Sequence, residues 1–204
     1  MIDWAQDREL GGFQADRVFF RLFKHLNWTF HGKRVLEVGF LGGADLWECH
    51  RQGAIVRGID INENAVRQLR HRGLPAEICN AARQAFPFAS MDLIYSMDTI
   101  YYFSDAEIEH FITECWRNLV VGGLCCVSIV EADYAGWTRL PTNFADSLNP
   151  FRFLDTVALT TQFSQAGFKL IARTAVIETY FVEEEFARHH RYLLFKKPEG
   201  QEIA

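Results

Sequence analysis

Apolar positions along the chain recur with two different spacings. Between residues 16 and 30 they return every three or four residues, which is the period of an amphipathic helix. Residues 34–38 and 55–59 are instead short, nearly continuous apolar runs, and such runs are typical of strands buried on both faces of a sheet. The pattern therefore predicts a helix followed by buried strands.

Helices and strands continue to alternate up to residue 130. The predicted helices cover residues 44–52, the stretch from Asn62 to Gly73 and the stretch from Ser104 to Gly122-Gly123, and the predicted strands cover residues 76–79, the segment that begins near Met91, and residues 124–130. Asn62 is a typical helix cap, and Ser104 with Glu107 three residues later matches a capping box. Glycine is common where helices end, so we expect the helices to stop at Gly73 and at Gly122-Gly123.

The last third of the chain is organised differently. Residues 131–150 contain several glycine, proline and asparagine breakers and predict an insertion rather than a regular element. A helix that ends at Gly167 follows, and then strand-like runs at residues 170–180 and 191–196, joined by an acidic piece at 183–189. No crossover helix of normal length fits between these two runs, so we expect them to pair antiparallel.

These elements together predict an α/β fold. Alternating strands and helices build a doubly wound, mostly parallel sheet, here seven-stranded, with helices on both faces and an antiparallel last strand. The 204 residues are 49% hydrophobic and 23% charged, which favours a single domain. We expect this domain to span residues 1–204, with a helical segment at 1–33 and the core at 34–198.

Charge and cysteine content exclude several classes of protein. The net charge is −5 and no run of Lys and Arg is long enough to follow a phosphate backbone, so a nucleic-acid partner is not expected. The five cysteines lack a C-x-x-C spacing, and neither a metal site nor a disulfide framework is expected. Arg21, Lys24 and His25 interrupt the apolar run near the N-terminus, so we expect no membrane span and a cytoplasmic protein.

The candidate chemistry lies directly after the first two predicted strands. In a doubly wound sheet the ligand lies beyond the carboxyl ends of the strands, and glycines there let the backbone approach it closely. Gly39, Gly42 and Gly43 follow the first strand, and Asp60 follows the second, 21 positions after Gly39. A carboxylate at this spacing can accept hydrogen bonds from a ribose diol, which indicates an adenosine-type ligand.

The residues around this glycine segment resemble the class I S-adenosylmethionine-dependent methyltransferase family. The first family motif is acidic-x-Gly-x-Gly-x-Gly, and this chain has Glu37, Gly39, Leu41 and Gly43 at those positions, with Leu41 departing from the pattern. The dinucleotide fingerprint G-x-G-x-x-G fits at only two of its three positions. Further segments similar to the family follow in the expected order at Asn80-Ala81 and at residues 86–98, 119–124 and 191–198.

The resemblance implies which residues bind the cofactor S-adenosyl-L-methionine. Glu37 would hold the glycine loop or meet the methionine amino group, Asp60 would bind the ribose, and Ser96 and Met97 would line the methionine arm. The full predicted cofactor set is Glu37, Gly39, Phe40, Gly42, Gly43, Asp60, Ile61, Asn80, Ala81, Ser96 and Met97.

Two residues are candidates for the methyl acceptor side of the site. Tyr101, in an aromatic cluster after the fourth strand, could stack on the acceptor, although such rings also fill cores. Glu131, after the fifth strand, could accept a proton from an amine or hydroxyl, although it could equally be a solvated loop carboxylate. Asp98 could be an acid or base, or a helix cap. The N-terminal segment at 1–33 and the insertion at 131–150 would cover the acceptor, the latter as a lid.

The function implied is methyl transfer to a small-molecule acceptor by in-line displacement. Two alternatives remain open: a methyltransferase that acts on a protein or other macromolecule, and a non-catalytic S-adenosylmethionine-binding protein. The chain has Ser96-Met97-Asp98-Thr99 where base and amide methylators have an Asn/Asp-Pro-Pro-aromatic motif. An oxidoreductase is the least favoured alternative, and the acceptor atom and the oligomeric state are not predicted.

Overall fold

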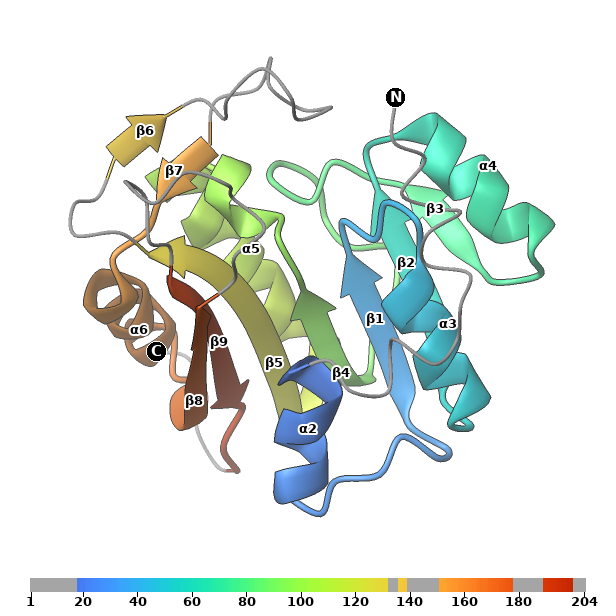
Figure 1. Cartoon of the computed structure of the whole chain (residues 1–204), viewed down its shortest axis with the longest axis horizontal. Helices are drawn as coiled ribbons and strands as arrows, with labels where there is room; N and C mark the ends of the chain where they lie inside the picture. The colour runs from blue at the N-terminus through green and yellow to red at the C-terminus, as the bar shows by residue number, and fades with distance from the viewer. Residues whose placement is uncertain (1–17, 132–135, 139–150, 178–188, 200–204) are drawn as a thin grey trace.

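A seven-stranded sheet forms the centre of the molecule (Figure 1). The computed structural model of the chain describes residues 18–131, 136–138, 151–177 and 189–199. The strands are β1 (Arg34–Val38), β2 (Ile55–Asp60), β3 (Ala76–Ile78), β4 (Met91–Ser96), β5 (Leu119–Glu131), β8 (Lys169–Ile177) and β9 (His189–Lys196), in the order β3-β2-β1-β4-β5-β9-β8. The strands from β3 to β5 pair parallel, and β9 pairs antiparallel with both β5 and β8. The predicted fold class is confirmed.

Helices cover both faces of this sheet. The helices α2 (Val18–His25), α3 (Ala44–Arg51) and α4 (Glu63–His71) pack on one face, and α5 (Asp105–Asn118) and α6 (Thr156–Gln165) pack on the other. Successive strand residues point to opposite faces, so Val35 joins the first of these cores and Leu36 the second. The near-continuous apolar runs in the sequence are explained by this double burial.

Local capping signals in the sequence form the expected helix starts. The Asn62 side chain accepts hydrogen bonds from the backbone N–H groups of Asn64 at 2.9 Å and Ala65 at 3.2 Å. Ser104 and Glu107 form the complete reciprocal capping box at the start of α5. Both predicted caps are confirmed.

The predicted end of α5 at Gly122-Gly123 is wrong. The helix ends at Asn118, and β5 begins at Leu119 and runs through both glycines. Lys197, from beyond the end of β9, donates hydrogen bonds to the backbone carbonyls of Trp116 at 2.6 Å and Leu119 at 2.9 Å. The carbonyls at the end of α5 are therefore satisfied by a side chain that is distant in sequence, and not by the glycine cap that the sequence predicted.

The region between β5 and α6 is described only in part. Residues Gly136–Thr138 form β6 and Phe151–Phe153 form β7, and these two strands pair antiparallel. The rest of the expected insertion, residues 1–17 of the segment expected at 1–33 and the acidic piece up to residue 188 lie outside the described residues. In the part of the chain that the structure describes, no helix is long and apolar enough to cross a membrane.

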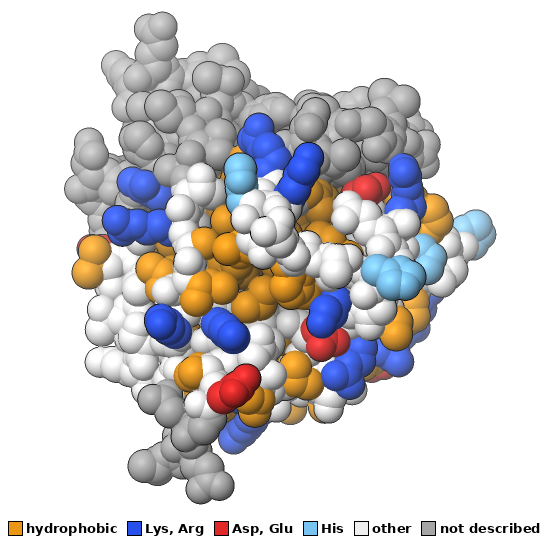
Figure 2. All heavy atoms as spheres, turned by 90° about the horizontal axis from the view of Figure 1, so that it is seen from below, with side chains coloured by type: hydrophobic (Ala, Val, Ile, Leu, Met, Phe, Trp, Pro, Cys, Tyr) orange, Lys and Arg blue, Asp and Glu red, His pale blue; other side chains and the backbone are white. Residues whose placement is uncertain are grey.

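The two edges of the sheet differ in character. The carboxyl ends of the parallel strands lie at the upper edge in Figure 1. Seen from below, Lys and Arg side chains surround a central group of hydrophobic ones (Figure 2). The acidic site described next lies at the opposite edge.

Candidate active site

A cavity of about 620 Å³ lies at the carboxyl edge of the sheet and is bounded by the segments that follow β1, β2, β3 and β4. This volume is within the range of small-molecule sites, roughly 300–1,000 Å³. Of the predicted cofactor residues, eight line the cavity: Glu37, Gly39, Phe40, Asp60, Ile61, Asn80, Ala81 and Met97. The fold thus brings together residues from four separate strand ends.

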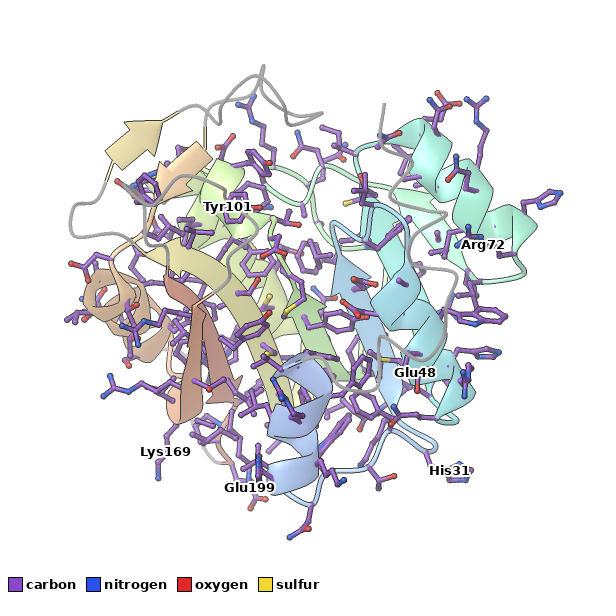
Figure 3. The ribbon with its side chains drawn as sticks, viewed as in Figure 1. His31, Glu48, Arg72, Tyr101, Lys169 and Glu199 are labelled. Atoms are coloured by element: carbon purple, nitrogen blue, oxygen red, sulfur yellow. The ribbon has the colours of Figure 1, made fainter. Side chains whose placement is uncertain are left out.

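Three predicted cofactor residues do not line this cavity: Gly42, Gly43 and Ser96. Gly43 begins α3 with a φ of +65°, and a Cβ atom there would lie 2.5 Å from Cδ1 of Leu69 in α4. The carbonyl of Gly42 accepts a hydrogen bond from Arg72 at 3.3 Å, and Figure 3 shows Arg72 beside α4. These two glycines allow the loop to pack against α4.

Ser96 is fully buried at the end of β4. Its hydroxyl donates a hydrogen bond to the carbonyl of Val38 at 3.0 Å, which joins the ends of β4 and β1. Ser96 therefore holds the two strand ends behind the cavity, whereas its neighbour Met97 faces the cavity itself.

At Gly39 the glycine loop packs tightly against the side chain of Thr99. The φ of Gly39 is +74°, its N–H donates to the carbonyl of Ile59 at 2.8 Å, and a Cβ atom would lie 2.1 Å from Oγ1 of Thr99. Only glycine fits there without displacing the segment after β4. Leu41, two residues further, also has a positive φ of +45°.

Asp60 fixes the shape of the glycine loop. One carboxylate oxygen accepts a hydrogen bond from the N–H of Leu41 at 2.9 Å, and the other accepts one from the N–H of Asn62 at 2.8 Å. Asp60 is 8% exposed and lines the cavity. Each carboxylate oxygen can accept two hydrogen bonds, so both retain acceptor capacity for a ligand hydroxyl.

The cavity lining is strongly acidic. It contains the side chains of Glu37, Asp45, Asp60, Asp98 and Glu107. Five carboxylates around one cavity create a negative potential that attracts a cationic ligand and repels a pyrophosphate group. The arrangement therefore favours a positively charged ligand over a dinucleotide.

Sequence reasoning did not identify two of these carboxylates. Asp45 is buried in the first turn of α3. In the sequence it could have been found as an acidic residue that follows directly after the glycine loop. Glu107 was interpreted only as part of a capping box. It also forms an ion pair with Arg83 at 2.9 Å, and a backbone hydrogen bond from Ser104, followed by Arg83, lowers the pKa of Glu107.

An aromatic wall closes the cavity beside α5. Tyr101 and Tyr102 belong to the short helix η1 (Ile100–Tyr102), and their ring centroids are 4.7 Å apart. Both tyrosines line the cavity and pack against Val130 and Phe153. Figure 3 shows Tyr101 near the start of α5, at the edge of the sheet where the cavity lies.

The other candidate catalytic residue, Glu131, is the last residue of β5, and its side chain lies outside the described part of the structure. Asp98 lines the cavity with a φ of +58°. Its N–H donates to Oγ of Ser128 and the Ser128 hydroxyl donates back to its carboxylate, both at 2.8 Å. The cap of the following short helix is Thr99 rather than Asp98.

A known family matches the segment of the chain that surrounds the cavity. Residues 36–127, which run from β1 into β5, match the family described as a methyltransferase domain. In this segment and in its fold, the chain is similar to the class I S-adenosylmethionine-dependent methyltransferase family. The matched segment contains the glycine loop, Asp60 and the aromatic wall.

One curated protein that the chain resembles is phosphoethanolamine N-methyltransferase 1 from Zea mays. The two sequences are 31% identical over 81 residues. This match covers 36% of the present chain and 16% of the maize protein, so the chain spans only a small part of that relative's length.

Solved structures share the fold at lower sequence identity. An S-adenosylmethionine-dependent methyltransferase from Mesorhizobium loti has a TM-score of 0.70 at 16% identity, with 90% of this chain and 99% of that chain covered. The 1,6-didemethyltoxoflavin-N1-methyltransferase of Burkholderia thailandensis, with bound 1,6-didemethyltoxoflavin and S-adenosylhomocysteine, has a TM-score of 0.68 at 16% identity, covering 95% and 83%. Both likenesses establish the shared fold.

Proposed function

We propose that the chain is a methyltransferase that binds S-adenosylmethionine in the acidic cavity and transfers the methyl group to a small-molecule acceptor. The observation that carries the proposal is that the glycine loop after β1 and the residues Glu37, Asp45 and Asp60 line the same cavity. The cofactor has a sulfonium cation and an ammonium group, and both are complementary to a cavity of this charge. The Burkholderia structure holds S-adenosylhomocysteine, the product that S-adenosylmethionine leaves after methyl transfer, and this gives independent support.

Each part of the cavity has a distinct role in the proposal. Asp60 binds the ribose hydroxyls with the acceptor capacity that its two backbone hydrogen bonds leave. Asn80 and Ala81 flank the adenine together with Ile61, which is 68% exposed after β2. Glu37 meets the methionine ammonium group, and Met97 lines the methionine arm.

The chemistry needs positioning more than it needs acid–base help. When bound, S-adenosylmethionine would supply an activated methyl group, and the residues of the cavity would have to hold the acceptor in line with its C–S bond. Holding two reactants in such a geometry can contribute about 7–11 kcal/mol in favourable cases. Tyr101 contributes by stacking on the acceptor, and Glu131 accepts the proton that an amine or hydroxyl acceptor releases.

The small size of the acceptor is supported by two observations. The aromatic wall of Tyr101 and Tyr102 bounds the same cavity that holds the cofactor, so the acceptor shares a volume of about 620 Å³ with it. The maize and Burkholderia relatives are both named for methylation of small molecules. An acceptor that fits beside the cofactor is therefore a small molecule or a single side chain.

Calorimetric titration with S-adenosylhomocysteine tests the cofactor assignment. We expect the wild type to bind, and Asp60→Ala to bind at least about tenfold more weakly because it removes a charged acceptor and loosens the loop. Glu63→Gln is the matched control, because Glu63 lies close by in α4 with a side chain that is 65% exposed. A wild type that binds NAD but not S-adenosylhomocysteine would overturn the proposal.

A transfer assay with methyl-labelled S-adenosylmethionine tests the acceptor class. The label should enter the small-molecule fraction of a metabolite extract. Tyr101→Ala should reduce the rate of this transfer, because the change removes part of the aromatic wall. Label in the protein or nucleic-acid fraction would replace the small-molecule acceptor with a macromolecular one. Cofactor binding without transfer to any fraction would favour a non-catalytic binding protein.

A further inference from the structure

Leu41, in the glycine loop, combines an unfavourable backbone conformation with an exposed apolar side chain. Among the described residues other than glycine, positive φ angles occur at Asn27, Leu41, Ser90 and Asp98. Asn and Asp tolerate this region because their short polar side chains form local hydrogen bonds, whereas an aliphatic side chain has no such compensation. Leu41 has a φ of +45° and is 50% exposed. Residues held in such a conformation cluster at functional sites.

The turn after β1 sets the conformation of Leu41. The N–H of Gly43 donates a hydrogen bond to the carbonyl of Phe40 at 2.7 Å, which closes a β-turn with Leu41 as its first central residue. Phe40 is buried with its ring against Gly58 of β2, where an added Cβ atom would lie 2.7 Å from Cδ1 of Phe40. The turn is therefore anchored in the core by Phe40, whereas Leu41 is on its exposed side.

Leu41 borders the part of the cavity in which the Asp60 carboxylate lies. It lines the cavity, and its N–H donates to Oδ2 of Asp60 at 2.9 Å. Among the exposed large apolar residues in the described part of the chain, Leu41 and Ile61 line the cavity, and Ile61 directly follows Asp60. Exposed apolar residues therefore adjoin this carboxylate from two segments, the loop after β1 and the end of β2.

We propose that Leu41 is a cofactor-binding residue whose side chain packs on the nucleoside part of S-adenosylmethionine beside Asp60. This inference rests on the proposed function, which assigns the ribose hydroxyls to Asp60. An apolar side chain that is exposed in the free protein and covered by a ligand contributes to affinity, and the C–H groups of a ribose offer it apolar surface. The family motif has glycine at this position, so the contact is a feature of this chain.

This role gives Leu41 opposite effects on the free protein and on the complex. Its left-handed backbone destabilises the free protein, and half of the residue is exposed, so it contributes little to the core. In the complex the same side chain is covered by the ligand. A residue that only supports the fold would behave differently, because its replacement would lower stability and affinity together.

Calorimetric titration with S-adenosylhomocysteine and with adenosine tests the inference. Leu41→Asn suits the left-handed region but removes the apolar side chain, and it should weaken the binding of both ligands by the same factor, about three- to tenfold. Leu41→Met keeps an apolar side chain of similar volume and should bind both within about twofold of the wild type. Wild-type affinity in Leu41→Asn, or an equal loss in Leu41→Met, would contradict the proposed contact. A loss for S-adenosylhomocysteine but not for adenosine would contradict its place at the nucleoside.

Thermal unfolding of the ligand-free variants separates binding from folding. Leu41→Asn should unfold at the wild-type temperature or above it, because asparagine tolerates the positive φ. Ser90→Gly relieves a φ of +61° at an exposed position outside the cavity lining, so it is the control and should leave the affinity for both ligands unchanged. If Leu41→Asn lowers the unfolding temperature as well as the affinity, Leu41 supports the fold and the inference is wrong. A wild type that binds neither ligand would instead reject the proposed function.

Discussion

At the scale of single residues, the site depends on backbone conformations that few side chains tolerate. Gly39, Leu41 and Asp98 all line the cavity with positive φ angles. Such conformations cost of order 1–3 kcal/mol each in residues other than glycine, and they persist where surrounding contacts over-determine them. Asp60 supplies that contact for Leu41, and Ser128 supplies it for Asp98.

Gly39 provides a direct test of this crowding. Gly39→Ala should lower the free energy of unfolding by about 2–4 kcal/mol, because it adds a clash with Thr99 to an unfavourable φ. Gly32→Ala is the matched control: its φ is nearly the same at +72°, but nothing lies within 4 Å of the added Cβ atom. That change should cost only about 1–2 kcal/mol. Urea denaturation would measure both, and equal losses would show that Thr99 does not constrain the loop.

At the scale of elements, short-range signals position the helices around the cavity. The capping box of Ser104 and Glu107 fixes the start of α5, and the aromatic wall lies immediately before it. Arg152 in β7 ties a second element to the same point, since it donates to the carbonyl of Phe103 at 3.1 Å and pairs with Asp105 at 2.6 Å. The wall is thus held by α5 and β7 together.

The capping box should give the stability a defined dependence on pH. The pKa of Glu107 is lowered in the folded protein, chiefly by the Ser104 backbone hydrogen bond, so its contribution is complete above the ordinary carboxyl pKa. It is lost as the pH falls through the lowered pKa. Glu107→Gln should therefore cost about 0.5–1 kcal/mol near neutral pH and progressively less in acid.

Thermal unfolding across a pH series would check this dependence. Glu109→Gln, an exposed position on the same helix, is the control and should give a smaller difference at neutral pH. A Glu107→Gln deficit that grows as the pH falls would contradict the assignment.

At the scale of the whole molecule, the C-terminal strand joins parts of the chain that are distant in sequence. β9 lies between β5 and β8, so it connects the edge strand β8 to the parallel part of the sheet. Lys197 extends this connection to the end of α5, 81 residues away, through its hydrogen bond to Trp116. The same ammonium group lies 5.0 Å from the centre of the Trp116 ring.

Lys197→Met should lower the free energy of unfolding by about 1.5–3 kcal/mol, because the carbonyls of Trp116 and Leu119 lose a charged donor. Lys196→Met changes an exposed neighbouring lysine and should cost less than about 0.5 kcal/mol. Chemical denaturation of both variants would measure the difference. Similar losses in the two would mean that the hydrogen bonds to the end of α5 contribute no stability.

The sequence by itself determined the features that depend on neighbouring residues. Uniform apolar runs predicted strands buried on both faces, and caps such as Asn62 and Ser104 predicted where helices begin. Strand order along the chain then predicted that the segments after β1, β2, β3 and β4 meet at one edge, which is why most of the expected cofactor residues line one cavity.

Tertiary structure decided whatever depends on contacts between distant residues. Lys197 rather than Gly122-Gly123 completes the end of α5, and Gly43 packs on α4 instead of facing the cavity. Tyr95 in β4 lies beside Glu37 in β1, a neighbour that only the pairing of the two strands brings to it. Spacing along the chain specifies local hydrogen bonds and the face on which a residue lies, but side-chain partners are known only once the strands are in register.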